Sequence, residues 1–201
     1  MRIIDCEQGS PEWLSARLGV PSASQFSKIV TGKGGKSTQV EAYINQLVAE
    51  ELTGETTLVY VNEHMKRGTE LEPDARELYE ALTGNTVQEL GFCLHDTVNA
   101  GCSPDGLVGE DGEGGLEIKC PAPATHVEWV KAGVVPSKHL QQIMGCLWVT
   151  GRQWWDFMSY HQTMKPLIVR VERDEEYIAA LAEHVTNAAL KIKQDVNQYF
   201  Q

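Results

Sequence analysis

The sequence predicts an α/β fold in which helices flank a central mixed β-sheet, and three observations support this class. The first part of the chain has apolar residues at helical spacing, the middle has short apolar runs typical of strands, and the rest mixes both patterns. With 201 residues, of which 42% are hydrophobic, the chain is long enough to bury one substantial core. We therefore expect a single domain over residues 1–201.

Capping residues, helix breakers and apolar spacing predict six helices. These helices cover residues 10–19, 21–29, 38–52, 62–82, 137–149 and 174–199. We expect Pro73 to interrupt or kink the fourth helix and Asp174 to cap the last one. Residues 31–37 are rich in Gly and Lys, so they are expected to form a loop.

Apolar runs bounded by turn residues predict five strands. These strands cover residues 86–94, 100–108, 114–119, 154–160 and 167–172. The first three are joined by turns and should form an antiparallel meander. The last two lie between the fifth and sixth helices, which gives the order expected of an α/β sandwich.

The second and third strands are predicted to form a hairpin. Residues 109–115 between them are too rich in glycine and acid to be core, so they are expected to form its turn, which folds Asp105 back beside Glu117. In Glu117-Ile118-Lys119 the charged residues are two apart. In a strand both would leave one face of the sheet, while Ile118 would be buried on the other.

Two carboxylates and one amine in such a hairpin suit phosphodiester hydrolysis. Mg²⁺ prefers carboxylate, carbonyl and water oxygens, so Asp105, Glu117 and the carbonyl of Ile118 are candidate ligands. Lys119 would orient the attacking water or stabilise developing charge. The alternative is that Glu117 and Lys119 form an ordinary surface ion pair, worth at most about 1 kcal/mol.

Two further residues are candidates for the same site. Glu72 lies next to the helix-disturbing Pro73, which makes it the acid of its helix best placed to reach the metal, although acids on this helix also fit a solvated face. Gln142 is either an amide at the edge of the core or a hydrogen-bond donor to the attacking water or to Glu72.

A third group of residues has the chemistry of a phosphate site. A guanidinium group and hydroxyls are donors suited to a terminal phosphate, although each residue alone also fits an exposed surface position. The candidates are Arg17, Ser22, Ser24 and Ser103.

The net charge of −11, with 28 acids against 17 bases, is unusual for a protein that binds nucleic acid. If DNA is the substrate, the basic residues must gather on one surface. Five cysteines, without a Cys-x-x-Cys pair, favour reduced thiols and a cytoplasmic location. No apolar run approaches the ~20 residues of a membrane span, and the first residues lack the apolar stretch of a signal peptide.

Several blocks occur in a characteristic order along nearly the whole chain. They are Gln8–Trp13, Arg17–Ser24, Arg67–Glu72, Ser103–Gly106, Leu116–Pro121, His139–Gln142 and Trp148–Gly151. In these blocks the chain resembles the lambda-type phage recombination exonucleases, the YqaJ-like viral recombinase family. The resemblance implies a PD-(D/E)XK nuclease fold, with a central mixed β-sheet flanked by α-helices.

The resemblance also implies roles for single residues. Asp105, Glu117 and Ile118 would bind metal, Glu72 would be the acid from the preceding helix, Lys119 would position or activate water, and Gln142 would support it. Residues implied in binding the DNA end are Arg17, Ser24 and Ser103 for the 5′-phosphate and Met65 for prying the duplex apart. Where family members often carry a second glutamine, this chain has Met144.

By the same resemblance, the protein would be a Mg²⁺-dependent alkaline exonuclease that degrades the 5′ strand of duplex DNA processively and leaves 3′ single-stranded tails for recombination. Two ions are expected, with Mn²⁺ as a substitute for Mg²⁺. The protein is also expected to form a homotrimeric ring and to have a single-strand annealing protein as its partner. Two alternatives remain open. One is an endonuclease of the same superfamily, and the other is a non-catalytic module that binds DNA ends.

Overall fold

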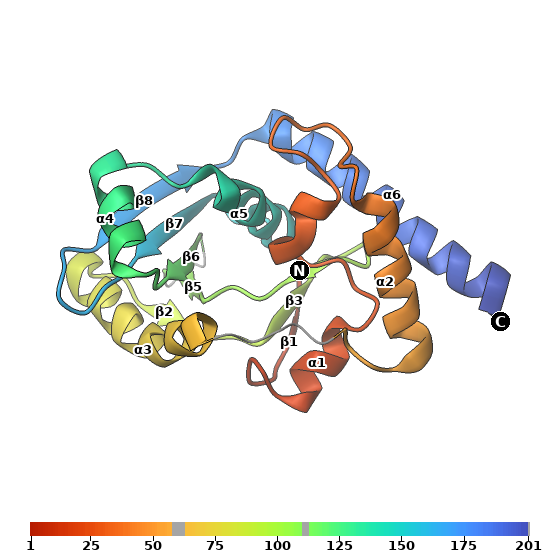
Figure 1. The fold of residues 1–201 in the computed structure, drawn as a ribbon, viewed down its shortest axis with the longest axis horizontal. Helices are drawn as coiled ribbons and strands as arrows, with labels where there is room; N and C mark the ends of the chain where they lie inside the picture. The colour runs from red at the N-terminus through yellow and green to blue at the C-terminus, as the bar shows by residue number, and fades with distance from the viewer. Residues whose placement is uncertain (58–62, 110–112, 201) are drawn as a thin grey trace.

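A five-stranded mixed sheet lies at the centre of the molecule (Figure 1). The computed structural model describes residues 1–57, 63–109 and 113–200, without the side chains of residues 63–66. The strands, in their order across the sheet, are β2 (Val87–Gln88), β5 (Gly106–Val108), β6 (Gly114–Lys119), β7 (Trp154–Ser159) and β8 (Leu167–Glu172). The pair β6–β7 is parallel and the other neighbours are antiparallel, which confirms the predicted mixed α/β sheet.

The helices cover both faces of this sheet. They are α1 (Pro11–Arg17), the 3₁₀ helix η1 (Ala23–Lys28), α2 (Val40–Thr53), α3 (Glu63–Thr83), α4 (Pro123–Ala132), α5 (Ser137–Thr150) and α6 (Glu175–Phe200). Figure 1 shows α3 on one side of the sheet and α4 and α5 on the other. Leu71 and Tyr79 of α3 pack with Ile118, whereas Ile143 of α5 packs with Phe157 in a separate core cluster.

The predicted three-stranded meander is wrong, because its first two strands each divide between two sheets. A smaller sheet contains β1 (Arg2–Ile4), β3 (Phe92–Leu94) and β4 (Gly101–Cys102). Between β4 and β5, Pro104 has no N–H to continue a ladder. Between β2 and β3 the chain passes Gly91, where a Cβ atom would lie 2.3 Å from the carbonyl oxygen of Cys6. The residues from Ser103 to Asp105 therefore lie at the junction of the two sheets.

Two helices and one strand differ from the prediction. Helix α3 is not interrupted at Pro73, which is exposed, because the apolar face of the helix packs on the sheet on both sides of this residue. Helix α4 and strand β1 were not predicted. Pro123 at the start of α4 and Gly133, which ends it with a φ of 67°, are the signals that identify such a helix. As predicted, Asp174 caps α6, since its Oδ1 accepts a 3.0 Å hydrogen bond from the N–H of Tyr177.

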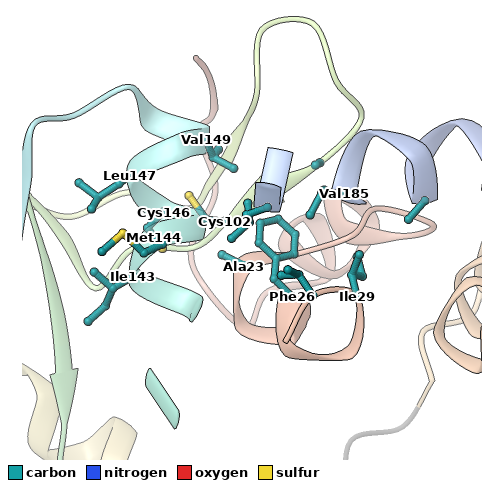
Figure 2. Packing of buried hydrophobic residues seen from close by; sticks show 14 of the residues in the cluster. Ala23, Phe26, Ile29, Cys102, Ile143, Met144, Cys146, Leu147, Val149 and Val185 are labelled. Carbon is teal, nitrogen blue, oxygen red and sulfur yellow. The ribbon is translucent and has the colours of Figure 1, made fainter. Parts of the chain in front are cut away.

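The core between η1, α5 and α6 depends on a close approach of helices. Figure 2 shows Phe26 of η1 and Ile29, which directly follows η1, beside Val185 of α6, with Met144 and Cys146 projecting from α5. At Gly145 of α5 a Cβ atom would lie 2.5 Å from the ring of Phe26. Only glycine permits this spacing, which fixes the position of α5 relative to the N-terminal part of the chain.

In the part of the chain that the structure describes, no helix combines the length and the apolar character that crossing a bilayer requires.

Candidate active site

The predicted pairing of the two hairpin strands is confirmed and brings Asp105 beside β6, whereas residues 110–112 of the predicted turn lie outside the described residues. Strand β5 pairs with β6 so that Gly106 lies opposite Leu116. Asp105, which directly precedes β5, accepts a 2.6 Å hydrogen bond from the N–H of Ile118 on its Oδ2. Ile118 itself points to the other face of the sheet, into the cluster formed with α3.

Glu117 is fully buried, so its contact with Lys119 is not an ordinary surface ion pair. The Lys119 ammonium and the Gln142 amide both reach Oε1 of Glu117, and the Gln142 Nε2 donates over 2.7 Å. The second oxygen, Oε2, is buried and has no hydrogen-bond partner among the described residues. One carboxylate oxygen is therefore held by two donors, and the other is left for a further ligand.

Glu72 joins this group from α3. Burial and, after it, the charge of Asp105 raise the pKa of Glu72 to about 7. The Oε1 of Glu72 also lies 3.4 Å from Nη2 of Arg76. Arg76 also donates to the carbonyl oxygen of Asp105, so this side chain links Glu72 to the hairpin, and the role of Glu72 at a metal stays a prediction. Gln142 contacts Glu117 rather than Glu72.

The electrostatics of the site are those of crowded, buried acids. Burial raises the pKa of Glu117 to about 7 and raises the pKa of Asp105, although Lys119 opposes both shifts. Burial alone would lower the pKa of Lys119, but Glu117 and Asp105 outweigh it and raise that pKa above its ordinary value. The lysine therefore remains an ammonium, and it cannot by itself neutralise three carboxylates.

A hard divalent cation fits this arrangement. The available donors are carboxylate oxygens of Asp105 and Glu117, including the unpaired Oε2, and the carbonyl of Ile118, and such oxygens are the ligands that Mg²⁺ prefers. Within the described residues, no three His, Cys, Asp or Glu side chains are arranged to hold one ion among themselves. A cation here would use the backbone carbonyl and water in addition to the two carboxylates.

The predicted phosphate-binding residues also lie together. Arg17 donates from Nη1 to the Oγ of Ser103 and from Nη2 to the Oγ of Ser22, both at 3.4 Å. The Oγ atoms of Ser22 and Ser24 are 3.4 Å apart. The guanidinium lies 4.0 Å from the ring centre of Trp13, whose Nε1 donates to Ser103 over 2.9 Å. One of these residues, Ser103, is two residues before Asp105, so the group lies next to the hairpin in the chain.

Of the other residues singled out in the sequence, Met144 joins neither group. The side chain of Met65 lies outside the described residues. Met144 of α5 is buried in the core with residues of η1, so it supplies no polar group to the site.

The sequence did not reveal two residues whose side chains hydrogen-bond to the backbone of residues 104–105. Arg76 contacts Glu72 and donates from Nε to the carbonyl oxygen of Asp105 over 3.4 Å. Gln8 donates from Nε2 to the carbonyl of Pro104 over 2.8 Å. The spacing of Glu72 and Arg76, four residues apart on a helix, was a usable signal for the first. Gln8 contacts backbone far away in sequence, and no local pattern reveals such a contact.

Comparison with known proteins places this geometry in context. The chain is 36% identical to the alkaline exonuclease LHK-Exo from Laribacter hongkongensis, with 94% of this chain and 95% of that one covered and a TM-score of 0.84. A structure of LHK-Exo in complex with dAMP matches equally well. A phage-related exonuclease from Haemophilus somnus 129PT shares the fold, at 15% identity over 89% of this chain and 96% of that one, with a TM-score of 0.68.

No curated protein matches the sequence significantly. The family model of the YqaJ-like viral recombinase domain matches residues 12–153, a range that includes every candidate residue of both groups. The resemblance and the PD-(D/E)XK nuclease fold predicted from the sequence are therefore confirmed. The chain belongs to the YqaJ-like viral recombinase family.

Proposed function

We propose that this protein, a nuclease by its family and by its likeness to an alkaline exonuclease, is a Mg²⁺-dependent enzyme that degrades duplex DNA from its 5′ ends. The observation that carries the proposal is the convergence of Glu72, Asp105, Glu117, Lys119 and Gln142 on one buried site.

In this proposal each residue has a separate task. Asp105, Glu117 and the Ile118 carbonyl hold the cation, with Mn²⁺ able to replace Mg²⁺ and two ions in the complete site. When bound, Mg²⁺ supplies Lewis-acid polarisation of the phosphate and makes water a stronger nucleophile. Lys119 orients the attacking water and stabilises charge on the phosphate, Gln142 fixes Glu117, and Glu72 is the acid that the preceding helix adds to the cation site.

The position of the phosphate-binding group supports a 5′→3′ direction. Ser103 is two residues from Asp105, so their Cα atoms are at most about 7 Å apart. If Arg17, Ser24 and Ser103 hold a terminal 5′-phosphate, the next phosphodiester bond of the same strand lies near the metal ligands. Repeated cleavage there would remove nucleotides from the 5′ strand and leave a 3′ tail.

A homotrimeric ring that encloses the duplex is also part of the proposal, together with a single-strand annealing protein that receives the 3′ tail in the cytoplasm. The net charge of −11 is compatible with a ring, because only the surface that faces DNA needs to be positive. The mass of the protein in solution tests the ring, and a monomeric mass would contradict it.

The main test compares a linear duplex that carries 5′-phosphates with a covalently closed plasmid. We expect Mg²⁺-dependent loss of the linear DNA, none with EDTA, and an intact plasmid. Lys119→Ala should slow digestion at least 100-fold, on the order of the loss seen when a charge-stabilising group is removed. Lys193→Ala, which changes an exposed lysine of α6, is the matched control and should leave the rate unchanged.

Each other result has a defined meaning. Digestion by Lys119→Ala at the parent rate would remove this lysine from the site. Cutting of the closed plasmid would favour the endonuclease alternative. Intact linear DNA that is nevertheless retarded in a gel would favour a non-catalytic module that binds DNA ends.

A further inference from the structure

Arg76 contacts three separate parts of the chain around the site. Its side chain is 12% exposed, and Nη2 lies 3.4 Å from Oε1 of Glu72, one turn earlier on α3. Its Nε donates over 3.4 Å to the carbonyl oxygen of Asp105. Its Nη1 lies 2.8 Å from Oε1 of Glu89, in the segment that connects β2 to β3. One guanidinium therefore touches the helix acid and the backbone of a metal-ligand candidate at the same time.

We propose that Arg76 is a positioning residue, which fixes the carboxylate of Glu72 relative to the turn that carries Asp105. The inference rests on the proposed function, since it explains how two acids from distant segments are held at the spacing that a shared cation requires. Glu89, whose side chain is 70% exposed, contacts the third nitrogen from the solvent side, and an ion pair this exposed contributes little to the position of the guanidinium.

The chemistry of arginine suits this task. A guanidinium is planar and rigid, with five N–H donors in fixed directions, so it can bind three acceptors at once and keep the angles between them. Lysine has the same charge, but its ammonium is a point donor on a flexible chain. The distinction between charge and geometry can therefore be tested by substitution.

A second side chain, that of Gln8, binds the same turn at the carbonyl of the residue before Asp105. Gln8 donates from Nε2 to the carbonyl of Pro104 over 2.8 Å and to the carbonyl of Leu90 over 3.0 Å. Arg76 and Gln8 thus both join the segment at residues 89–90 to the turn at residues 104–105. The turn makes no ladder hydrogen bonds with the strands that the structure describes, because it lies between two sheets, and these two side chains replace them.

The need for such positioning follows from the electrostatics of the site. Glu72 and Asp105 are both carboxylates. The charge of Asp105 raises the pKa of Glu72, and the charges of both raise the pKa of Glu117. Carboxylates that repel one another separate unless other groups hold them. A cationic fork between Glu72 and Asp105 opposes the repulsion and at the same time restricts movement of both groups.

The test compares Arg76→Lys, which keeps the charge and removes the fork, with the parent. We expect the single-turnover rate of cleavage of a 5′-phosphorylated duplex, at saturating Mg²⁺, to fall about 10- to 100-fold, as is typical when a group that orients metal ligands is changed. The affinity for Mn²⁺, measured by calorimetry without DNA, should also fall. Binding of DNA ends in EDTA, measured by fluorescence anisotropy, should stay within about two-fold, because the group around Arg17 is untouched.

The matched control is Glu89→Gln, which removes the exposed partner and leaves the contacts to Glu72 and Asp105. It should keep Mn²⁺ affinity and the cleavage rate within about three-fold of the parent. Arg76→Gln is a second variant, in case Arg76→Lys does not fold. The midpoint of thermal unfolding shows which variant is folded at the temperature of the assay. Parent-like Mn²⁺ affinity and cleavage in a folded Arg76 variant would overturn the proposal, and so would equal losses in Glu89→Gln.

The two proposals fail in different ways. Because Mn²⁺ binding is measured without DNA, it tests the role of Arg76 even if the parent protein does not degrade linear DNA. That last result would count against the proposed function alone.

Discussion

At the scale of single residues, the candidate site is a set of donors matched to buried acceptors. The Oε1 of Glu117 accepts from both Lys119 and Gln142, whereas its Oε2 is buried without a partner among the described residues. An unsatisfied buried carboxylate oxygen is costly, so it indicates a position where a ligand belongs. The group around Arg17 has the opposite character, since it consists of a guanidinium, an indole N–H and hydroxyls that hydrogen-bond to one another.

Replacing Arg17 should affect recognition of the DNA end rather than the chemistry. Arg17→Ala removes a charge-assisted contact to a phosphate, typically on the order of 1.5–3 kcal/mol. We expect the preference for 5′-phosphoryl over 5′-hydroxyl ends to fall at least about 10-fold, which competition between the two duplexes would measure. Arg2→Ala, a change of an exposed arginine in β1, should leave the preference intact. Equal discrimination by parent and Arg17→Ala would exclude Arg17 from the phosphate site.

At the scale of secondary-structure elements, α5 links the core to the site. The helix carries Gln142 in its first half and packs Gly145 directly against Phe26 of η1. The element η1 begins after Ser22, which belongs to the group around Arg17. The contact between α5 and η1 therefore connects the metal-ligand candidates with the phosphate-binding candidates through tightly packed helices.

Substitution of Gly145 should disturb this connection. In Gly145→Ala the new Cβ would lie 2.5 Å from Phe26 and 3.1 Å from the Cβ of Ala23, so one element must move. Overpacking of this kind costs about 1–3 kcal/mol of unfolding free energy. Denaturant unfolding measures the loss.

The control for this substitution is Gly68→Ala in α3. A Cβ atom there meets nothing within 4 Å, so the change should be neutral or stabilise the helix by up to about 1 kcal/mol. Unchanged stability of Gly145→Ala would show that η1 and α5 are less tightly packed than described.

At the scale of the whole molecule, the site is assembled where the two sheets meet. The turn from Ser103 to Asp105 joins β4 of the small sheet to β5 of the large one. Helix α3 approaches this turn from one face of the large sheet, and α5 approaches β6 from the other (Figure 1). Folding of the whole chain is therefore needed before the acids come together, and their repulsion acts on the stability of the whole molecule.

Stability should consequently depend on pH and on divalent metal. Burial raises the pKa of Glu117 and of Glu72 to about 7, above the usual value of 4.5 that applies when the chain is unfolded. Between these values the folded protein binds more protons than the unfolded chain, so stability falls as pH rises. In EDTA we expect a loss of roughly 1–3 kcal/mol from pH 5 to pH 8, and Mg²⁺ should restore stability most at the higher pH.

Scanning calorimetry over this pH range, with EDTA and with Mg²⁺, measures the effect. Glu117→Gln cannot ionise, so its stability should decline less with pH, and the difference from the parent isolates the contribution of this residue. An increase in stability of the parent from pH 5 to pH 8 in EDTA would contradict the expected sign.

Local features of the fold were predictable because they depend on neighbouring residues. The acid- and glycine-rich turn predicted the hairpin that sets Asp105 beside β6, and the two-residue spacing of Glu117 and Lys119 predicted their common face. The division of residues 86–94 and 100–108 between two sheets was not predictable in the same way. It depends on the close approach of Gly91 to Cys6 and on the partners available to each half strand.

The sequence by itself determined the family, the α/β class and the hairpin with its two carboxylates and its amine, since motif order and spacing are properties of the chain. Only the tertiary structure decided that Gln142 contacts Glu117, that Arg17 contacts Ser103, and that Arg76 joins Glu72 to the turn of Asp105. These contacts connect segments far apart in the chain. They form because packing of the helices on the two sheets brings the segments together, and no local pattern contains that information.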